Sequence, residues 1–149
     1  MTTIQIYDAR KKRVGTAERI EKPDTEWKKL LTKEQYEITT RKGTEAPRSC
    51  PFSEVHEPGI FQCVRCATDL FRSATKFESG TGWPSFYEPV SPLNVVEQTD
   101  YSLGMTRTEV LCAPCGSHLG HVFPDGPRPT GRRYCMNGFA LNFVADGKP

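Results

Sequence analysis

Four of the six cysteines constrain this chain most, because they stand in two matched Cys-x-x-Cys pairs. The pairs are Cys63-Val64-Arg65-Cys66 and Cys112-Ala113-Pro114-Cys115. A Cys-x-x-Cys turn presents two sulfurs to one side of a metal, and two such turns complete the tetrahedral shell of a structural zinc site. The sequence therefore predicts one structural Zn²⁺, with four ligands: Cys63, Cys66, Cys112 and Cys115.

Two other uses of these cysteines remain open. A redox dithiol is one, since Cys-Ala-Pro-Cys is similar to a thioredoxin-type motif, although Gly116 and the polar stretch behind it are a poor helix start. A mixed shell is the other, and its ligands would be Cys112, Cys115, His118 and His121. Two complete cysteine pairs already fill the four positions of zinc, so both histidines are candidates for chemistry instead.

Length and composition favour one soluble domain. The 149 residues suffice for one modest core. Mean hydropathy is −0.56, and no apolar run approaches the ~20 residues of a membrane span. A net charge of +2 does not indicate nucleic-acid binding. The first 22 residues lack the apolar core of a signal peptide, so we expect the cysteines to serve metal binding and redox chemistry in the cytoplasm.

The sequence pattern changes near residue 45, from helical signals to short apolar stretches. Residues 1–22 are predicted to be a weakly ordered extension, and 23–149 the domain itself. A short helix capped by Asp24 or Thr25 is followed by one that starts at the capping box Thr32 to Gln35 and ends at 41–43. After residue 45, Pro and Gly separate strand-sized apolar stretches: Phe61–Val64, Leu70–Phe71, Val95–Val96, Glu109–Leu111 and Phe139–Val144. We therefore expect a mainly β fold with antiparallel sheets.

The segment 132–139 is typical of a β-strand, in which side chains alternate between two faces. Arg133, Cys135 and Asn137 then share one face. A guanidinium beside a thiol favours the thiolate, which is the nucleophilic form. A buried structural cysteine is the alternative, but the polar neighbours on its own face favour a reactive Cys135.

Two further motifs carry candidate functional residues. His118 and His121, with Asp125 close behind, offer imidazoles that titrate near neutral pH, although either could be structural. A Gly- and Pro-rich loop displays Trp83, which either anchors the core or forms the apolar wall of a pocket.

Taken together, these motifs resemble the B-type peptide-methionine sulfoxide reductases, over about residues 24–145. The matching stretches are short and follow one another in order: Glu26-Trp27, residues 31–36, Gly43-Thr44-Glu45, Pro58-Gly59-Ile60-Phe61, Gly82-Trp83-Pro84-Ser85-Phe86, residues 118–123, Asp125, Pro129-Thr130-Gly131 and Arg133-Tyr134-Cys135-Met136-Asn137.

The resemblance implies two antiparallel sheets forming a small barrel-like domain, a structural zinc, and reduction of the R epimer of methionine sulfoxide in oxidised proteins or peptides. In that chemistry Cys135 attacks the sulfoxide sulfur and is left as a sulfenic acid, while Trp83 packs against the substrate methyl group. The other implied site residues supply, tune or orient proton donors: His118, His121, Asp125, Arg133 and Asn137.

The chain departs from the common family pattern at the recycling cysteine. Many members carry that cysteine in the Ser-Gly-x-Gly-Trp-Pro loop, where this chain has Thr81. Cys50 is the thiol left over, so we predict a Cys50–Cys135 disulfide that thioredoxin reduces. The alternative is an inert Cys50 and direct reduction of the sulfenic acid by an external thiol.

Two other functions fit part of the pattern. A zinc-ribbon binding module explains the paired cysteines but leaves Cys135, the histidines and Trp83 without roles. A thiol–disulfide oxidoreductase that uses Cys112 and Cys115 predicts that zinc is absent.

Overall fold

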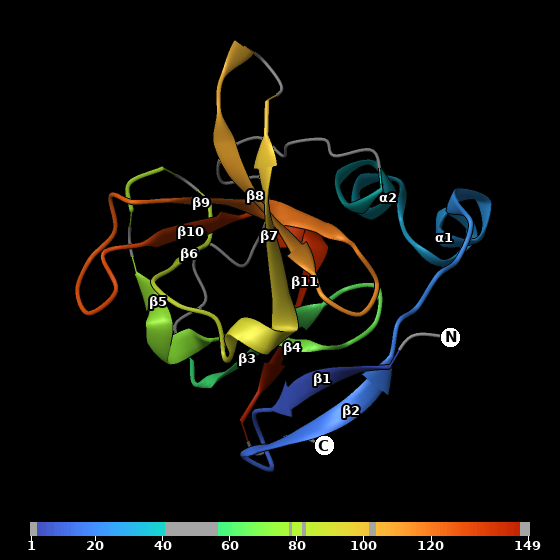
Figure 1. Ribbon diagram of the computed structural model, residues 1–149, viewed down its shortest axis with the longest axis horizontal. Helices are drawn as coiled ribbons and strands as arrows, with labels where there is room; N and C mark the ends of the chain where they lie inside the picture. Colours follow the sequence, from blue (N-terminus) through green and yellow to red (C-terminus); the bar gives the residue numbers. More distant parts are fainter. Residues whose placement is uncertain (1–2, 41–56, 78, 82, 102–103, 147–149) are drawn as a thin grey trace.

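The structure is a computed structural model that describes residues 3–40, 57–77, 79–81, 83–101 and 104–146. Its largest element is an antiparallel sheet with the strand order β5-β6-β10-β9-β8-β7. In that order its strands are β5 (Lys76–Phe77), β6 (Ser85–Phe86), β10 (Arg133–Met136), β9 (His118–Phe123), β8 (Arg107–Cys112) and β7 (Val95–Asp100). The β7–β8 hairpin extends beyond the rest of this sheet (Figure 1).

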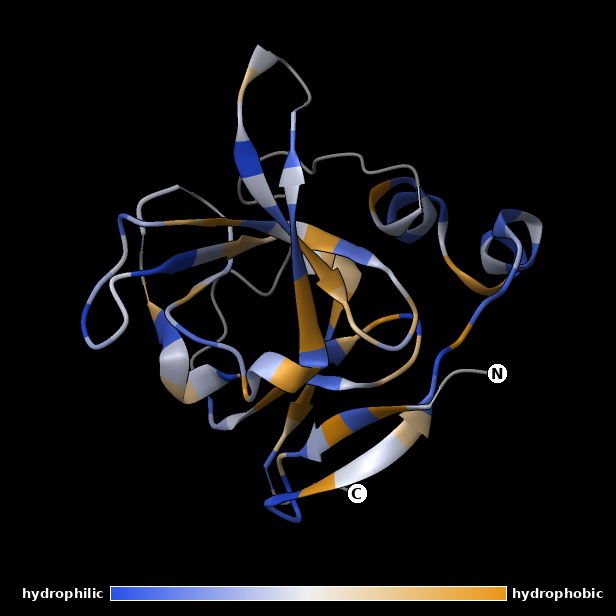
Figure 2. Cartoon of the chain, viewed as in Figure 1, coloured by the Kyte–Doolittle hydropathy of each residue, from blue (hydrophilic) through white to orange (hydrophobic). Residues whose placement is uncertain are grey.

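A second antiparallel sheet packs against the first and closes the core. It has the order β11-β3-β4, with β11 (Leu141–Ala145), β3 (Gly59–Cys63) and β4 (Asp69–Arg72). Phe86 of the large sheet stacks on Phe71 at 4.4 Å between ring centroids and meets Phe61 edge-on at 5.1 Å. All three rings are fully buried, and apolar stretches of both sheets meet in the middle of the molecule (Figure 2). The predicted mainly β fold with antiparallel sheets is confirmed.

Two short helices, α1 (Asp24–Leu30) and α2 (Lys33–Thr39), lie side by side at one flank of the sheets (Figure 1). The predicted capping box is present: the Thr32 hydroxyl accepts from the Gln35 amide at 3.2 Å, and the Gln35 side chain accepts from the Thr32 amide at 2.9 Å. Asp24 is the first residue of α1 rather than its cap, since Pro23 takes the cap position. The predicted helix end at 41–43 lies outside the described residues.

The N-terminal segment differs from the weakly ordered extension predicted for residues 1–22. Strands β1 (Thr3–Asp8) and β2 (Arg13–Glu18) form an antiparallel hairpin. Asn94, which is fully buried, accepts a hydrogen bond from the Tyr7 amide at 2.9 Å and donates to the Tyr7 carbonyl at 3.0 Å. These long-range bonds join the hairpin at Tyr7 to the body of the protein, and they cannot be predicted from the composition of the segment itself.

Two strand predictions also need correction. Phe139 lies in a 3-10 turn (Gly138–Ala140), and the strand that follows starts only at Leu141. Strand β9 was not among the predicted stretches, because two histidines and a glycine interrupt its apolar residues. In the described part of the chain, no helix is long and apolar enough to cross a membrane.

Candidate active site and metal centre

The two Cys-x-x-Cys pairs come together as one cluster able to hold a metal ion. The four sulfurs lie within 4.8 Å of one another, and the Cys63–Cys115 and Cys66–Cys112 pairs are each 3.6 Å apart. Four sulfurs bonded tetrahedrally at ~2.3 Å to one zinc lie about 3.8 Å from each other, so the observed spacing fits a ZnS₄ site.

The two turns of this cluster are built alike. Strand β3 ends at Cys63 and strand β8 ends at Cys112. The residue after each second cysteine has a left-handed backbone, with φ of 61° at Ala67 and 73° at Gly116. The amide of that residue donates to the carbonyl of the first cysteine at 2.8 Å in both turns. Equivalent backbones therefore aim the two sulfur pairs at a common point.

Crowding and burial govern the protonation of the four thiols. Burial raises the pKa of the Cys63 thiol well above its usual value. Hydrogen bonding with Cys112 lowers the pKa of Cys66. Four crowded thiols cannot all ionise against one another, whereas a dication between them favours the thiolate form of each.

A bulge in β9 gathers the two histidines on one face. In the pairing with β8, His121 lies opposite Glu109 and Gly120 opposite Val110, but His118 lies opposite Leu111. One extra residue therefore stands in β9, and it shifts the alternation of side chains. The centroids of the His118 and His121 rings are therefore 5.6 Å apart. In a regular strand, two residues three positions apart would point to opposite faces.

Cys135 lies on β10 directly opposite His121 of β9. Tyr134 and Met136, its neighbours in sequence, are 3% and 1% exposed, whereas Cys135 itself is half-buried. The predicted alternation of this strand is thus confirmed over Arg133–Met136. Side chains directly opposite in an antiparallel pair have Cβ atoms about 5 Å apart, so the thiol and the imidazole are neighbours.

Cys135 opens into a pocket of about 270 Å³. The pocket gathers residues of β8, β9, β10 and the loop before β6: Thr81, Trp83, Arg107, Gly120, His121, Phe123, Arg133, Cys135, Met136 and Asn137. Five of the site residues named from the sequence therefore share one cavity. His118 lines a different pocket, beside Cys115 and Thr39.

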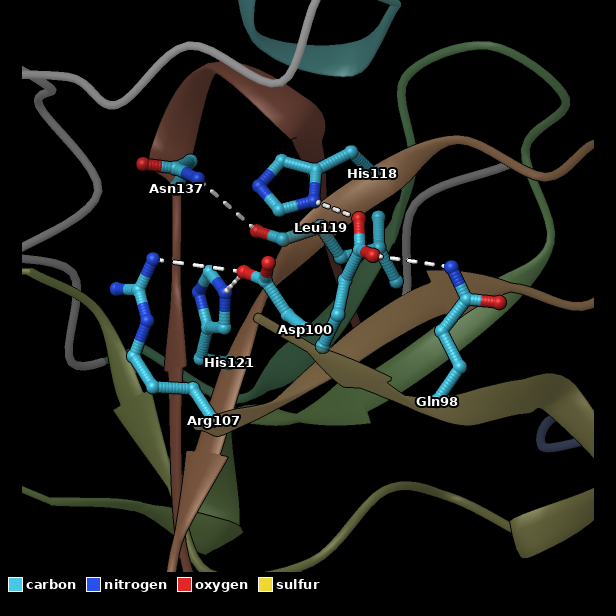
Figure 3. Close-up of polar contacts among 8 residues, drawn as sticks. Gln98, Asp100, Arg107, His118, Leu119, His121 and Asn137 are labelled. Carbon is cyan, nitrogen blue, oxygen red and sulfur yellow. Dashed lines mark hydrogen bonds and ion pairs between the residues drawn. The ribbon is translucent and has the colours of Figure 1, made fainter. Parts of the chain in front are cut away.

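Each of the two β9 histidines is paired with a carboxylate that was not identified from the sequence. Glu109 Oε2 lies 2.6 Å from His118 Nδ1, and Asp100 Oδ2 lies 2.7 Å from His121 Nε2 (Figure 3). An ionised carboxylate can only accept, so the bonded ring nitrogens carry hydrogen. Glu109 directly precedes the apolar residues Val110 and Leu111 in β8, which is at most a weak sequence signal. Asp100 offers no local signal, because only the pairing of β7, β8 and β9 in the sheet brings it to His121.

Asp125 pairs with Arg133 rather than standing beside a histidine. Arg133 Nε donates to Asp125 Oδ1 at 2.9 Å, and its guanidinium lies 4.4 Å from the centroid of the Phe123 ring. The hydrogen bond from Arg133 lowers the pKa of Asp125. This ion pair and the aromatic ring hold the guanidinium at the edge of the pocket that contains Cys135.

Asn137 is tied to the bulged strand. Its backbone amide donates to the Leu119 carbonyl at 2.8 Å, and its side-chain amide donates to the same oxygen at 3.3 Å (Figure 3). Cys50, the predicted resolving thiol, lies outside the described residues. Thr81, the residue at the position expected for a recycling cysteine, lines the pocket that contains Cys135, as does Trp83.

A half-buried thiol, an imidazole and a tryptophan around one small pocket, with a separate four-cysteine cluster, are the parts of a cysteine-dependent enzyme with a structural metal site. The sequence matches the SelR domain over residues 31–145. The chain belongs to this family, that of the MsrB peptide methionine sulfoxide reductases, as the resemblance implied, and is an enzyme.

Individual relatives are similar over most of their length. The chain is 55% identical over 127 residues to peptide methionine sulfoxide reductase MsrB of Methanosarcina barkeri, which covers 85% of this chain and 89% of the relative. It is 51% identical over 128 residues to MsrB of Agrobacterium fabrum, with 86% and 95% covered. It is 52% identical over 127 residues to MsrB of Pseudomonas syringae pv. syringae, with 85% and 97% covered.

Proposed function

We propose that this enzyme reduces the R epimer of methionine sulfoxide in oxidised proteins and peptides to methionine. The observation that carries the proposal is the shared pocket of Cys135, His121 and Trp83. A nucleophile, a proton donor and an apolar wall meet there, and these are the groups that a methylsulfinyl side chain requires.

In the first step the Cys135 thiolate attacks the sulfoxide sulfur and forms a sulfur–sulfur bond, while the oxygen takes up one proton. The resulting hydroxyl group then passes to the cysteine sulfur as the sulfur–sulfur bond breaks, so that methionine leaves and Cys135 becomes a sulfenic acid. The sulfoxide sulfur is reduced by two electrons and the cysteine sulfur is oxidised by two. Arg133, held beside the thiol by Asp125, favours the thiolate needed for attack.

His121 is the proton donor that we assign to the sulfoxide oxygen, because it lines the pocket directly opposite Cys135. His118 lies behind it and supports its position through ring contact. Trp83 receives the methyl group. Three fixed contacts, to oxygen, methyl and sulfur, suffice to distinguish the two epimers, and the family resemblance implies the R epimer.

For recycling, the sulfenic acid condenses with the Cys50 thiol, which releases water and leaves a Cys50–Cys135 disulfide. The dithiol of thioredoxin then reduces that disulfide by exchange. Such a cycle requires a reducing compartment, so we place the enzyme in the cytoplasm. The cluster of Cys63, Cys66, Cys112 and Cys115 holds one structural Zn²⁺ that stabilises the fold.

The test is an epimer-resolved assay on peptides carrying one methionine sulfoxide, with thioredoxin, its reductase and NADPH. We expect conversion of the R epimer and negligible conversion of the S epimer. Equal conversion of both epimers, or of the S epimer alone, would contradict the proposal.

The recycling step is tested separately with Cys50→Ser. This variant should form about one methionine per enzyme and then stop with thioredoxin, while dithiothreitol restores turnover because it reduces the sulfenic acid directly. Thr81→Ser is the matched control, since it alters the loop that faces Cys135 without removing a thiol. Full thioredoxin-dependent turnover in Cys50→Ser would show that Cys50 is not the resolving thiol.

A further inference from the structure

Two carboxylate–histidine pairs are built side by side on strands β7, β8 and β9 (Figure 3). Gln98 lies opposite Glu109, and two residues further along the hairpin Asp100 lies opposite Arg107. Each of these cross-strand pairs offers one carboxylate to a histidine of β9 and one donor to that carboxylate. The Gln98 side chain donates to Glu109 at 3.0 Å, and Arg107 donates to Asp100 at 3.4 Å.

The two pairs differ in burial and in charge. The His118 and Glu109 side chains are 4% and 3% exposed, and their supporting donor, Gln98, is neutral. The His121 and Asp100 side chains are 13% and 18% exposed, and their supporting donor, Arg107, is a cation. Arg107 and His121 both line the pocket that contains Cys135, whereas His118 faces another cavity.

We propose that Asp100 and Arg107 are positioning residues that make His121 the proton donor of the pocket and set, by their opposite charges, the pH range over which it donates. This inference rests on the proposed sulfoxide reduction. Asp100 orients the ring through Nε2, and its negative charge favours the imidazolium. Arg107 holds the Asp100 carboxylate against the ring, and its positive charge disfavours the imidazolium.

Other charged or titratable groups face His121 and are common to every variant compared. They come from strands β8, β9 and β10: Glu109, His118, Arg133 and Cys135. Because these groups stay in place, changes at Asp100 and Arg107 report on their own two charges. A charge within about 6 Å shifts a neighbouring titration by one or more pH units.

The opposite signs of the two charges lead to opposite expectations. The rate falls at alkaline pH when the donor has lost its proton. Asp100→Asn keeps an oxygen that can accept from the ring but removes the negative charge, so the alkaline limb should move down by about one pH unit. Arg107→Gln removes the positive charge, so the limb should move up by up to about one unit. Arg107→Lys keeps the positive charge, so its pH profile should match that of the wild type.

The experiment measures the first-turnover rate against pH, without recycling reductant, for the wild type and these three variants. Imidazole resonances of histidine-labelled protein are titrated by NMR in parallel, with His121→Gln to assign the signal. Glu97→Gln is the matched control. Glu97 lies on β7, as Asp100 does, but outside the pocket, and the substitution breaks its 2.6 Å ion pair with Arg132. The pH profile of this variant should therefore equal that of the wild type.

Opposite shifts from Asp100→Asn and Arg107→Gln support the proposal, because a purely structural role would slow both variants without moving the limb in opposite directions. Shifts in the same direction, or no shift of either the limb or the His121 resonance, would overturn it. The NMR titration needs no substrate, so absence of sulfoxide reduction in the wild type would refute the proposed function and still leave the charge effect at His121 measured.

Discussion

The thiols of the four clustered cysteines and the thiol of Cys135 lie in two different environments. Cys63, Cys112 and Cys115 are at most 7% exposed and meet one another's sulfurs. Cys135 is half-buried, and its pocket offers His121 and Arg133. Thiols that face each other form a metal site, whereas a thiol that faces a cation and an imidazole is suited to nucleophilic attack.

One hairpin serves both regions. Strand β8 ends at Cys112, the turn carries Cys115, and β9 begins at His118 and continues to His121. A metal bound at the turn therefore fixes the start of the strand that bears both histidines. The cluster can therefore affect the pocket through the position of β9, whereas Cys135 lines the pocket itself.

The largest effect that we expect is loss of stability on metal removal. Binding of structural zinc by four cysteines contributes ~10–16 kcal/mol in small domains, so a strong chelator should cost this fold at least about 5 kcal/mol, enough to abolish a cooperative unfolding transition. Calorimetry together with metal analysis by mass spectrometry checks this. An unchanged melting temperature in protein shown to be metal-free would contradict a structural role for the four-cysteine cluster.

Cys135→Ser is expected to show the reverse pattern. Removal of the proposed nucleophile should lower methionine formation by about three orders of magnitude or more. Metal content and melting temperature should stay at the wild-type values, since Cys135 is outside the cluster. Peptide assays and metal analysis on one preparation check both. Loss of zinc in this variant would mean that Cys135 helps to hold the metal.

Substitution of His118 should mainly lower stability, whereas substitution of His121 should mainly lower activity. His118→Ala leaves Glu109, which is 2% exposed, without its imidazole, and should cost roughly 3 kcal/mol of unfolding free energy. His121→Ala should lower the first-turnover rate by about 100-fold and change stability little. Urea denaturation and single-turnover assays measure the two effects. A larger rate loss for His118→Ala than for His121→Ala would assign proton donation to His118.

The smallest expected effect concerns the backbone of the two metal-binding turns. Ala67→Gly relieves a side chain at φ 61° and should stabilise the metal-bound protein by about 0.5–1 kcal/mol. Gly116→Ala is its mirror image at φ 73° and should cost about 1 kcal/mol, because an added Cβ meets no atom within 4 Å and only the backbone is strained. Denaturation midpoints of the two metal-bound variants measure both changes in stability. Changes of the same sign in Ala67→Gly and Gly116→Ala would show that the two turns are not equivalent.

Features encoded by short spacing were predictable from the sequence. The Cys-x-x-Cys pairs, the capping box at Thr32 and the alternation around Cys135 each depend on residues a few positions apart, where backbone geometry is regular. The N-terminal hairpin was not predictable in this way. It is held by Asn94, whose amide bonds Tyr7 across 87 residues, and a single buried asparagine leaves no local pattern.

The sequence by itself determined which residues are able to bind metal and which are able to react, because these properties belong to side-chain types at fixed short intervals. Tertiary structure alone decided which partners they meet. A one-residue bulge brings His118 and His121 to one face, and the β7–β8 register places Glu109 and Asp100 against them. Asp125, which follows the histidines in the sequence, pairs with Arg133. The physical reason is that sheet register joins residues far apart in the chain, and a shift of one residue reverses every side chain.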